Sequence, residues 1–209
     1  MNSSEKTILE YIAETSKNLV WWKPEQRARG EDLINDPTKG ERPWTIPEKT
    51  GVLLYETVIA SRSSSILELG TSIGYSTIWM AYALKNTNGH IHTIEQSLNK
   101  IPIARANFEL AGVRDSVTLH EGAIIDVLKS LPDEIMFDGV FLDADRGHYH
   151  EYFPLIEPRL KPGSWVIADN AGNMSKRMAP FFELLTERGW EYEILDMDNG
   201  ILVARKKTL

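Results

Sequence analysis

The chain has 209 residues, of which 42% are hydrophobic and 25% are charged, as in an ordinary globular protein with one domain or a domain and an appendage. It contains no cysteine, which excludes disulfides, thiolate metal sites and cysteine nucleophiles and points to a reducing cytoplasm. A net charge of -7 argues against a large nucleic-acid surface and favours a small-molecule partner. Its apolar runs are too short for a signal peptide or a membrane span, so we expect a cytoplasmic protein that does not bind membranes.

The first 44 residues differ in pattern from the rest of the chain. Apolar residues between positions 8 and 19 recur at roughly helical spacing and predict one amphipathic helix. The stretch Trp21–Trp44 has no lasting period and contains several prolines and glycines, which is typical of an irregular connection. We therefore divide the chain into residues 1–44, a substrate cap or dimer contact, and residues 45–209, the main domain.

Strand and helix patterns then alternate along the main domain. The strand patterns are "SILELG", "HIHTIE", "SVTLHE", "FDGVFLD" and "SWVIADN", and the helix patterns that follow them cover residues 75–86, 98–111, 123–131, 148–160 and 175–188. Such a series predicts a parallel sheet with helices on both faces. The ending "WEYEILDMDNGILVARK" predicts two more strands joined by a tight turn. The predicted fold is α/β: a Rossmann-like, doubly wound sheet of seven strands, mostly parallel, with an antiparallel C-terminal hairpin strand.

Glycines and acidic residues follow the first two predicted strands. "ILELGTSIGYST" has Glu68 and Gly70 where the first strand ends and Gly74 where the next helix begins. Ligands of open parallel sheets bind at these strand ends, and glycine permits a close backbone approach. The spacing is not G-x-G-x-x-G, which argues against a nicotinamide-dependent dehydrogenase. Glu95 ends the second strand, where it suits a grip on ribose hydroxyls, although a helix-capping role fits the spacing equally well.

Oxygen-bearing side chains follow the fourth and fifth strands. Asp143 closes one strand, and Asp169 and Asn170 close the next, so their side chains are expected to converge. Mg2+ prefers such oxygens in an octahedron, and three protein ligands would leave three positions for water and substrate. The alternative is that these residues cap strand ends or pair with Arg146 and Lys176.

Together these motifs resemble the class I S-adenosylmethionine-dependent methyltransferases, and among them the metal-dependent O-methyltransferases that include catechol and caffeoyl-CoA O-methyltransferases. The motifs that carry the resemblance are "ILELGTSIGYST", "FLDAD", "IADN" and "DNGILVARK", within a match from about Thr45 to Lys206. The resemblance implies S-adenosylmethionine and Mg2+ or another divalent cation as cofactors. It also implies a hydroxylated aromatic acceptor and a homodimer.

The resemblance also implies a role for individual residues. Asp143, Asp169 and Asn170 would hold the cation. The cofactor would be contacted by Glu68, Gly70, Thr71 and Ser76 around its methionine part, by Glu95 at the ribose hydroxyls, by Ala123 at the adenine, and also by Gln96 and Asp143.

The chain departs from the family pattern at the position where the family has a lysine that is thought to accept a proton. Here the residue is Arg146, whose guanidinium stays protonated, so it stabilises an oxyanion but cannot be the base. The cation alone would suffice for an acidic phenol. Otherwise His148 or His150 would accept the proton, unless both are surface loop residues.

A second departure concerns the segment after the Asp-Asn pair. Members of the family usually have a long insertion there, whereas this chain has only the short segment "AGNMSKR", so we expect a more open pocket on that side. Trp21, Trp22 and Trp44 either cover this opening or pack in the core or a dimer interface. Two competing functions stay open. One is methylation of a hydroxylated tRNA base, against which the acidic charge argues, and the other is cofactor binding with lost catalysis, which Arg146 and the short segment favour.

Overall fold

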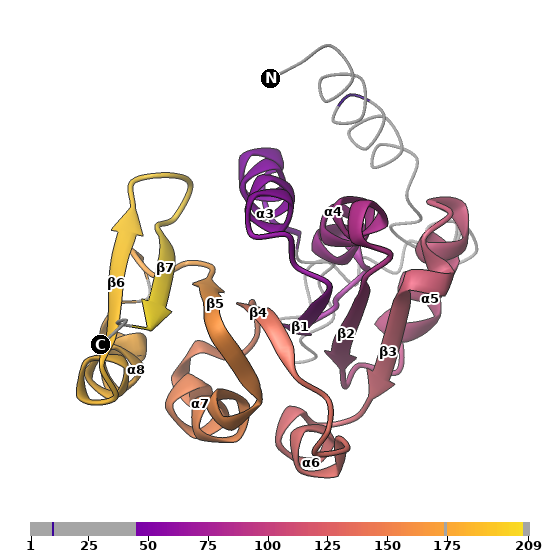
Figure 1. The fold of residues 1–209 in the computed structure, drawn as a ribbon. Helices are drawn as coiled ribbons and strands as arrows, with labels where there is room; N and C mark the ends of the chain where they lie inside the picture. Colours follow the sequence, from indigo (N-terminus) through magenta and orange to yellow (C-terminus); the bar gives the residue numbers. More distant parts are fainter. Residues whose placement is uncertain (1–9, 11–44, 174, 207–209) are drawn as a thin grey trace, which may run out of the picture.

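The computed structural model describes residue 10, residues 45–173 and residues 175–206. The three tryptophans of the N-terminal segment lie outside the described residues, so a cap or dimer contact there stays a prediction. In the described part a central sheet carries helices on both faces (Figure 1).

The sheet has seven strands in the described part of the chain, in the order β3-β2-β1-β4-β5-β7-β6. Their bounds are β1 Ser65–Leu69, β2 His90–Glu95, β3 Val117–Glu121, β4 Phe137–Leu142, β5 Leu160–Ala168, β6 Trp190–Leu195 and β7 Ile201–Lys206. Strands β1 to β5 pair in parallel, and β7 is antiparallel to both β5 and β6. This confirms the predicted sheet. The order reverses between β1 and β4, the place where such sheets open a crevice for ligands.

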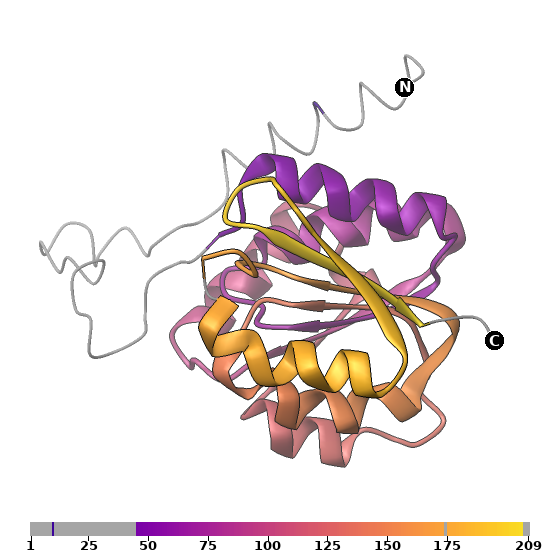
Figure 2. The ribbon, with the colours of Figure 1, turned by 90° about the vertical axis from the view of Figure 1, so that its left-hand side faces the viewer.

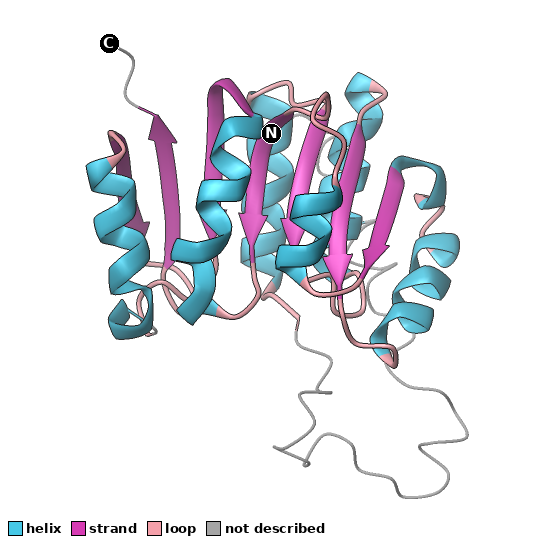
Figure 3. Ribbon diagram, turned by 90° about the horizontal axis from the view of Figure 1, so that it is seen from below, coloured by secondary structure: helices cyan, strands magenta, loops and turns pink. Residues whose placement is uncertain are grey.

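In the described part of the chain, three α-helices lie on each face of the sheet (Figures 1 and 2). One layer holds α3 Glu48–Ala60, α4 Tyr75–Leu84 and α5 Lys100–Leu110, and the other holds α6 Ile124–Ser130, α7 Tyr149–Ile156 and α8 Ser175–Glu187. Figure 3, a view from below, shows the second layer of helices in front of the strands. Two helices end earlier than predicted, because the 3₁₀ turns η2 Lys85–Thr87 and η5 Glu157–Arg159 complete the periodic pattern. None of the described helices has both the length and the apolar character needed to cross a lipid bilayer.

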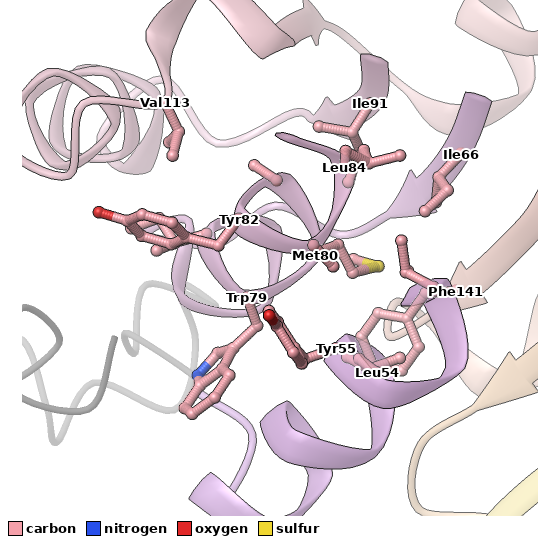
Figure 4. Packing of buried hydrophobic residues seen from close by; sticks show 14 of the residues in the cluster. Leu54, Tyr55, Ile66, Trp79, Met80, Tyr82, Leu84, Ile91, Val113 and Phe141 are labelled. Carbon is pink, nitrogen blue, oxygen red and sulfur yellow. The ribbon is translucent and has the colours of Figure 1, made fainter. Parts of the chain in front are cut away.

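Both faces of the sheet are buried in apolar cores. Leu54 of α3 and Trp79 of α4 belong to one cluster with Ile66 and Phe141 of the sheet, and all four side chains are buried (Figure 4). On the opposite face, strand residues such as Leu67 form a second core with α6, α7 and α8. Strands that are covered on both sides read as continuous apolar runs, which is why their ends, where polar residues begin, were visible in the sequence.

Candidate functional site

A cavity of about 510 Å³ opens at the carboxyl ends of β1, β2, β4 and β5. It therefore lies at the reversal of strand order. Seven of the residues expected to bind a cofactor or a cation line it together with Arg146; the seven are Gly70, Glu95, Gln96, Ala123, Asp143, Asp169 and Asn170. Four other candidates do not line it, namely Glu68, Thr71, Ser76 and His148.

The glycine loop after β1 brings two strand ends together. Gly70 has a φ of 97°, and a Cβ built on it would lie 2.2 Å from the backbone oxygen of Asp143. The Asp143 amide donates to the Leu69 carbonyl at 3.0 Å, while the amides of Gly70 and Thr71 donate to the Ile94 carbonyl at 3.1 Å. Only glycine fits this close approach, so the loop holds Asp143 at a fixed distance from the β1 end.

Glu68 lies beneath this loop and is fully buried. Its carboxylate accepts hydrogen bonds from Ser76 Oγ and Thr77 Oγ1 at 2.5 Å each and from Thr93 Oγ1 at 2.6 Å. Burial raises the pKa of Glu68 to about 7, although the three hydroxyl bonds act in the opposite direction.

The expected contact of Glu68, Thr71 and Ser76 with the methionine part of the cofactor stays a prediction. Their side chains are all buried, and Thr71 Oγ1 joins the same network through Thr93 at 2.6 Å. The reason is the two-residue period of a strand, which points Glu68 toward α4 and not toward the loop edge. These residues support the loop from below and are not part of the cavity wall.

Glu95 ties three loop amides together at the cavity. Its carboxylate accepts hydrogen bonds from the backbone amides of Ser72 at 2.7 Å, Gln96 at 3.0 Å and Ser97 at 2.8 Å. Each carboxylate oxygen has further acceptor capacity, so the side chain both shapes the loop and remains able to accept from a ligand hydroxyl. Ala123 and the neighbouring isoleucines of α6 line another part of the cavity and give it an apolar wall.

The other end of the cavity carries two carboxylates. Arg146 Nη2 lies 2.7 Å from Asp143 Oδ1 and 3.8 Å from Asp169 Oδ2. Burial raises the pKa of Asp143, while the charge of Arg146 lowers it. Burial, and then the charge of Asp143, raise the pKa of Asp169 to about 7. The two buried carboxylates therefore favour a positively charged group at this end of the cavity.

Asn170 completes this end in an unusual backbone conformation, with a φ of 62°. Its Nδ2 donates to Asp169 Oδ2, and its Oδ1 accepts from Asn199 Nδ2 at 3.2 Å. The loop is braced by the β6–β7 turn, since the Ala171 amide donates to the Gly200 carbonyl at 2.7 Å. A Cβ on Gly200 would lie 2.4 Å from the Gly172 nitrogen, so the two backbones are in direct contact.

The donor set is compatible with a hard cation. It offers two carboxylates and one amide, the oxygen ligands that Mg2+ prefers. No group of three histidine, cysteine, aspartate or glutamate side chains suited to a metal occurs among the described residues. A cation here would depend on the Asn170 amide as its third protein ligand.

His148 lies outside the cavity and is about half exposed. Its Nδ1 is 3.2 Å from Asp145 Oδ2, and its ring stacks on the Tyr152 ring with the two centroids 6.2 Å apart. His150 likewise does not line the cavity. Neither side chain lines the cavity, and a role for His148 or His150 in accepting the substrate proton stays a prediction.

Sequence reasoning missed several residues that shape the site. Ser72 lines the cavity with a φ of 49°, and its place inside the glycine motif could have revealed it. Lys100 and Tyr152 also line the cavity, but each lies within a helix pattern and shows no local signal. Asn199 contacts Asn170 across 29 positions, a contact that no local pattern predicts.

Comparisons with known proteins show which family the chain belongs to. A family model described as a methyltransferase domain matches residues 67–171, half of the chain. A catechol O-methyltransferase of Niastella koreensis is 41% identical over 111 residues, which cover 52% of this chain and 50% of that protein. A catechol O-methyltransferase of Sus scrofa is 35% identical over 135 residues, covering 62% of this chain and 72% of that protein.

A solved structure covers the whole chain. The O-methyltransferase TomG from Streptomyces achromogenes, crystallised with S-adenosylmethionine, superimposes with a TM-score of 0.74 and 25% identity, and the match covers 100% of both chains. The present chain spans about half the length of the first three curated relatives that it matches. The chain belongs to the methyltransferase domain family, in the class I, S-adenosylmethionine-dependent group that includes the catechol O-methyltransferases.

Proposed function

We propose that this protein transfers a methyl group from S-adenosylmethionine to a phenolic or catechol-like hydroxyl, with a divalent cation at Asp143, Asp169 and Asn170. The observation that carries the proposal is one cavity with two chemically different ends. Glu95 and an apolar wall lie toward β2 and α6, and the two carboxylates with Asn170 lie at β4 and β5.

The first end suits the cofactor. Glu95 would accept hydrogen bonds from ribose hydroxyls, and Gln96 and Ala123 would flank the adenine. Gly70 leaves room for the methionine part because it carries no side chain. S-adenosylmethionine, when bound, supplies an electrophilic methyl group on a sulfonium.

The second end suits a hydroxyl acceptor. When bound there, a divalent cation lowers the pKa of a hydroxyl and fixes its position. Arg146 remains protonated and would stabilise a negatively charged acceptor oxygen from a position displaced from the two carboxylates. A cavity of about 510 Å³ is within the range of small-molecule sites, which supports a small molecule as the acceptor. A homodimer and a cytoplasmic location stay predictions.

The test is a methyl-transfer assay on a panel of catechols and single phenols, with product S-adenosylhomocysteine measured in the presence of Mg2+ or of a chelator. The proposal expects turnover with catechols and a large loss with the chelator, restored by added Mg2+. Turnover that is indifferent to the chelator would remove the cation from the proposal. Cofactor binding by calorimetry without turnover of any phenol would favour a binding protein with lost catalysis.

A further inference from the structure

Arg146 lies where a bound cation would be attracted. One nitrogen, Nη2, contacts Asp143 Oδ1 at 2.7 Å and is 3.8 Å from Asp169 Oδ2. The side chains of the two aspartates are only 15% and 8% exposed, so water screens this charge cluster weakly. A guanidinium at this place compensates the same negative charges that a divalent ion would.

The pairing is incomplete on the arginine side. Guanidinium and carboxylate groups often pair through two parallel hydrogen bonds, but here one nitrogen serves both carboxylates. Arg146 Nε is buried and has no hydrogen-bond partner among the described residues. A buried donor without a partner is unfavourable, so the pairing is weaker than a two-pronged ion pair and easier to displace.

We infer that Arg146 is an internal cation that compensates Asp143 and Asp169 and competes with a divalent ion for them. The inference rests on the cation site of the proposed function and adds a determinant of its affinity. With the guanidinium in place, an entering ion meets a positive charge beside its ligands. Ion binding therefore requires Arg146 to move away, and the cost of this movement weakens the affinity for the ion.

The experiment titrates Mn2+ alone into the full chain, without cofactor or acceptor, and measures free Mn2+ by electron paramagnetic resonance. It compares the wild type with Arg146→Gln, which removes the charge and keeps a polar side chain of similar shape. Arg177→Gln is the matched control, because Arg177 pairs with Asp145 at 3.0 Å and does not line the cavity. Asp169→Ala removes one expected ligand.

Arg146→Gln is expected to lower the Kd for Mn2+ roughly ten- to a hundredfold, the range that corresponds to one hydrogen bond to a charged group. Arg177→Gln should leave the Kd unchanged, and Asp169→Ala should weaken binding strongly. If Arg146→Gln does not fold, Arg146→Lys keeps the charge on a more flexible side chain, and the same titration should give a smaller decrease in Kd.

An equal Kd in the wild type and the Arg146 variant would overturn the inference, and so would the absence of Mn2+ binding in both. Methyl transfer to catechol is measured on the same preparations. Turnover by the wild type with no change of Kd in Arg146→Gln refutes the competition and leaves the proposed function intact. A lower Kd without any turnover supports the competition and refutes the proposed function.

Discussion

Replacing Glu68 with glutamine should change how stability depends on pH. Burial raises the pKa of Glu68 from an ordinary value of 4.5 to about 7. Between these values the folded protein keeps a proton that the unfolded chain has lost, so the unfolding free energy falls as the pH rises. The contribution of Glu68 is fully present below pH 4.5 and is lost as the pH rises through about 7.

The size of the effect follows from the shift. A difference of 7 − 4.5 = 2.5 pKa units at 1.36 kcal/mol per unit gives about 3 kcal/mol. Glutamine does not titrate and fills nearly the same space. The difference in unfolding free energy, Glu68→Gln minus wild type, should therefore rise by most of this amount between pH 5 and pH 8.

Urea unfolding of both proteins at pH 5, 6, 7 and 8 measures this difference. Other titrating groups, including Asp169, are common to both proteins and largely cancel. Thr77→Val removes one of the three hydroxyl donors, so it should raise the pKa of Glu68 further and steepen the fall of stability with pH. A difference between Glu68→Gln and wild type that stays constant from pH 5 to pH 8 would refute the reasoning.

Three further predictions concern other parts of the molecule. Asp169→Ala should abolish cation-dependent turnover while cofactor affinity by calorimetry stays near that of the wild type, whereas Glu95→Ala should weaken cofactor binding; the reverse pattern would contradict the two-ended cavity. Gly70→Ala should destabilise the fold by more than about 1 kcal/mol in urea unfolding, because its φ of 97° is strained and the new Cβ meets the Asp143 backbone. Burial lowers the pKa of His92 to about 4, so its contribution to stability is present above pH 6.5 and is lost as the pH falls toward 4; His92→Phe should reduce this acid-induced loss, and an unchanged acid melting profile would argue against it.

The sequence predicted the sheet well because buried parallel strands are apolar on both faces and end where polar residues begin. The same rule located Gly70, Glu95, Asp143 and Asp169, which all lie at or directly after a strand end and line the cavity. Strand bounds were less accurate. For example, β5 begins at Leu160, four positions before the predicted Ser164, beside an irregular register with β4.

The site was predicted less completely, for two physical reasons. Whether a polar side chain at a strand end faces a ligand or the core depends on strand twist and on the helix above it, as Glu68 illustrates with its three hydroxyl partners. Contacts between distant parts of the chain leave no local pattern. The brace of Asn199 on Asn170 and the approach of Arg146 to Asp169 both arise only when the sheet has assembled.

The contact between Gly172 and Gly200 also makes the two ends of the cavity depend on different parts of the chain. Every residue expected to bind S-adenosylmethionine precedes position 144, whereas the loop after β5 is braced by the β6–β7 turn. A substitution that loosens this turn is therefore expected to disturb the Asp169–Asn170 end of the cavity and to spare the end that is expected to bind the cofactor.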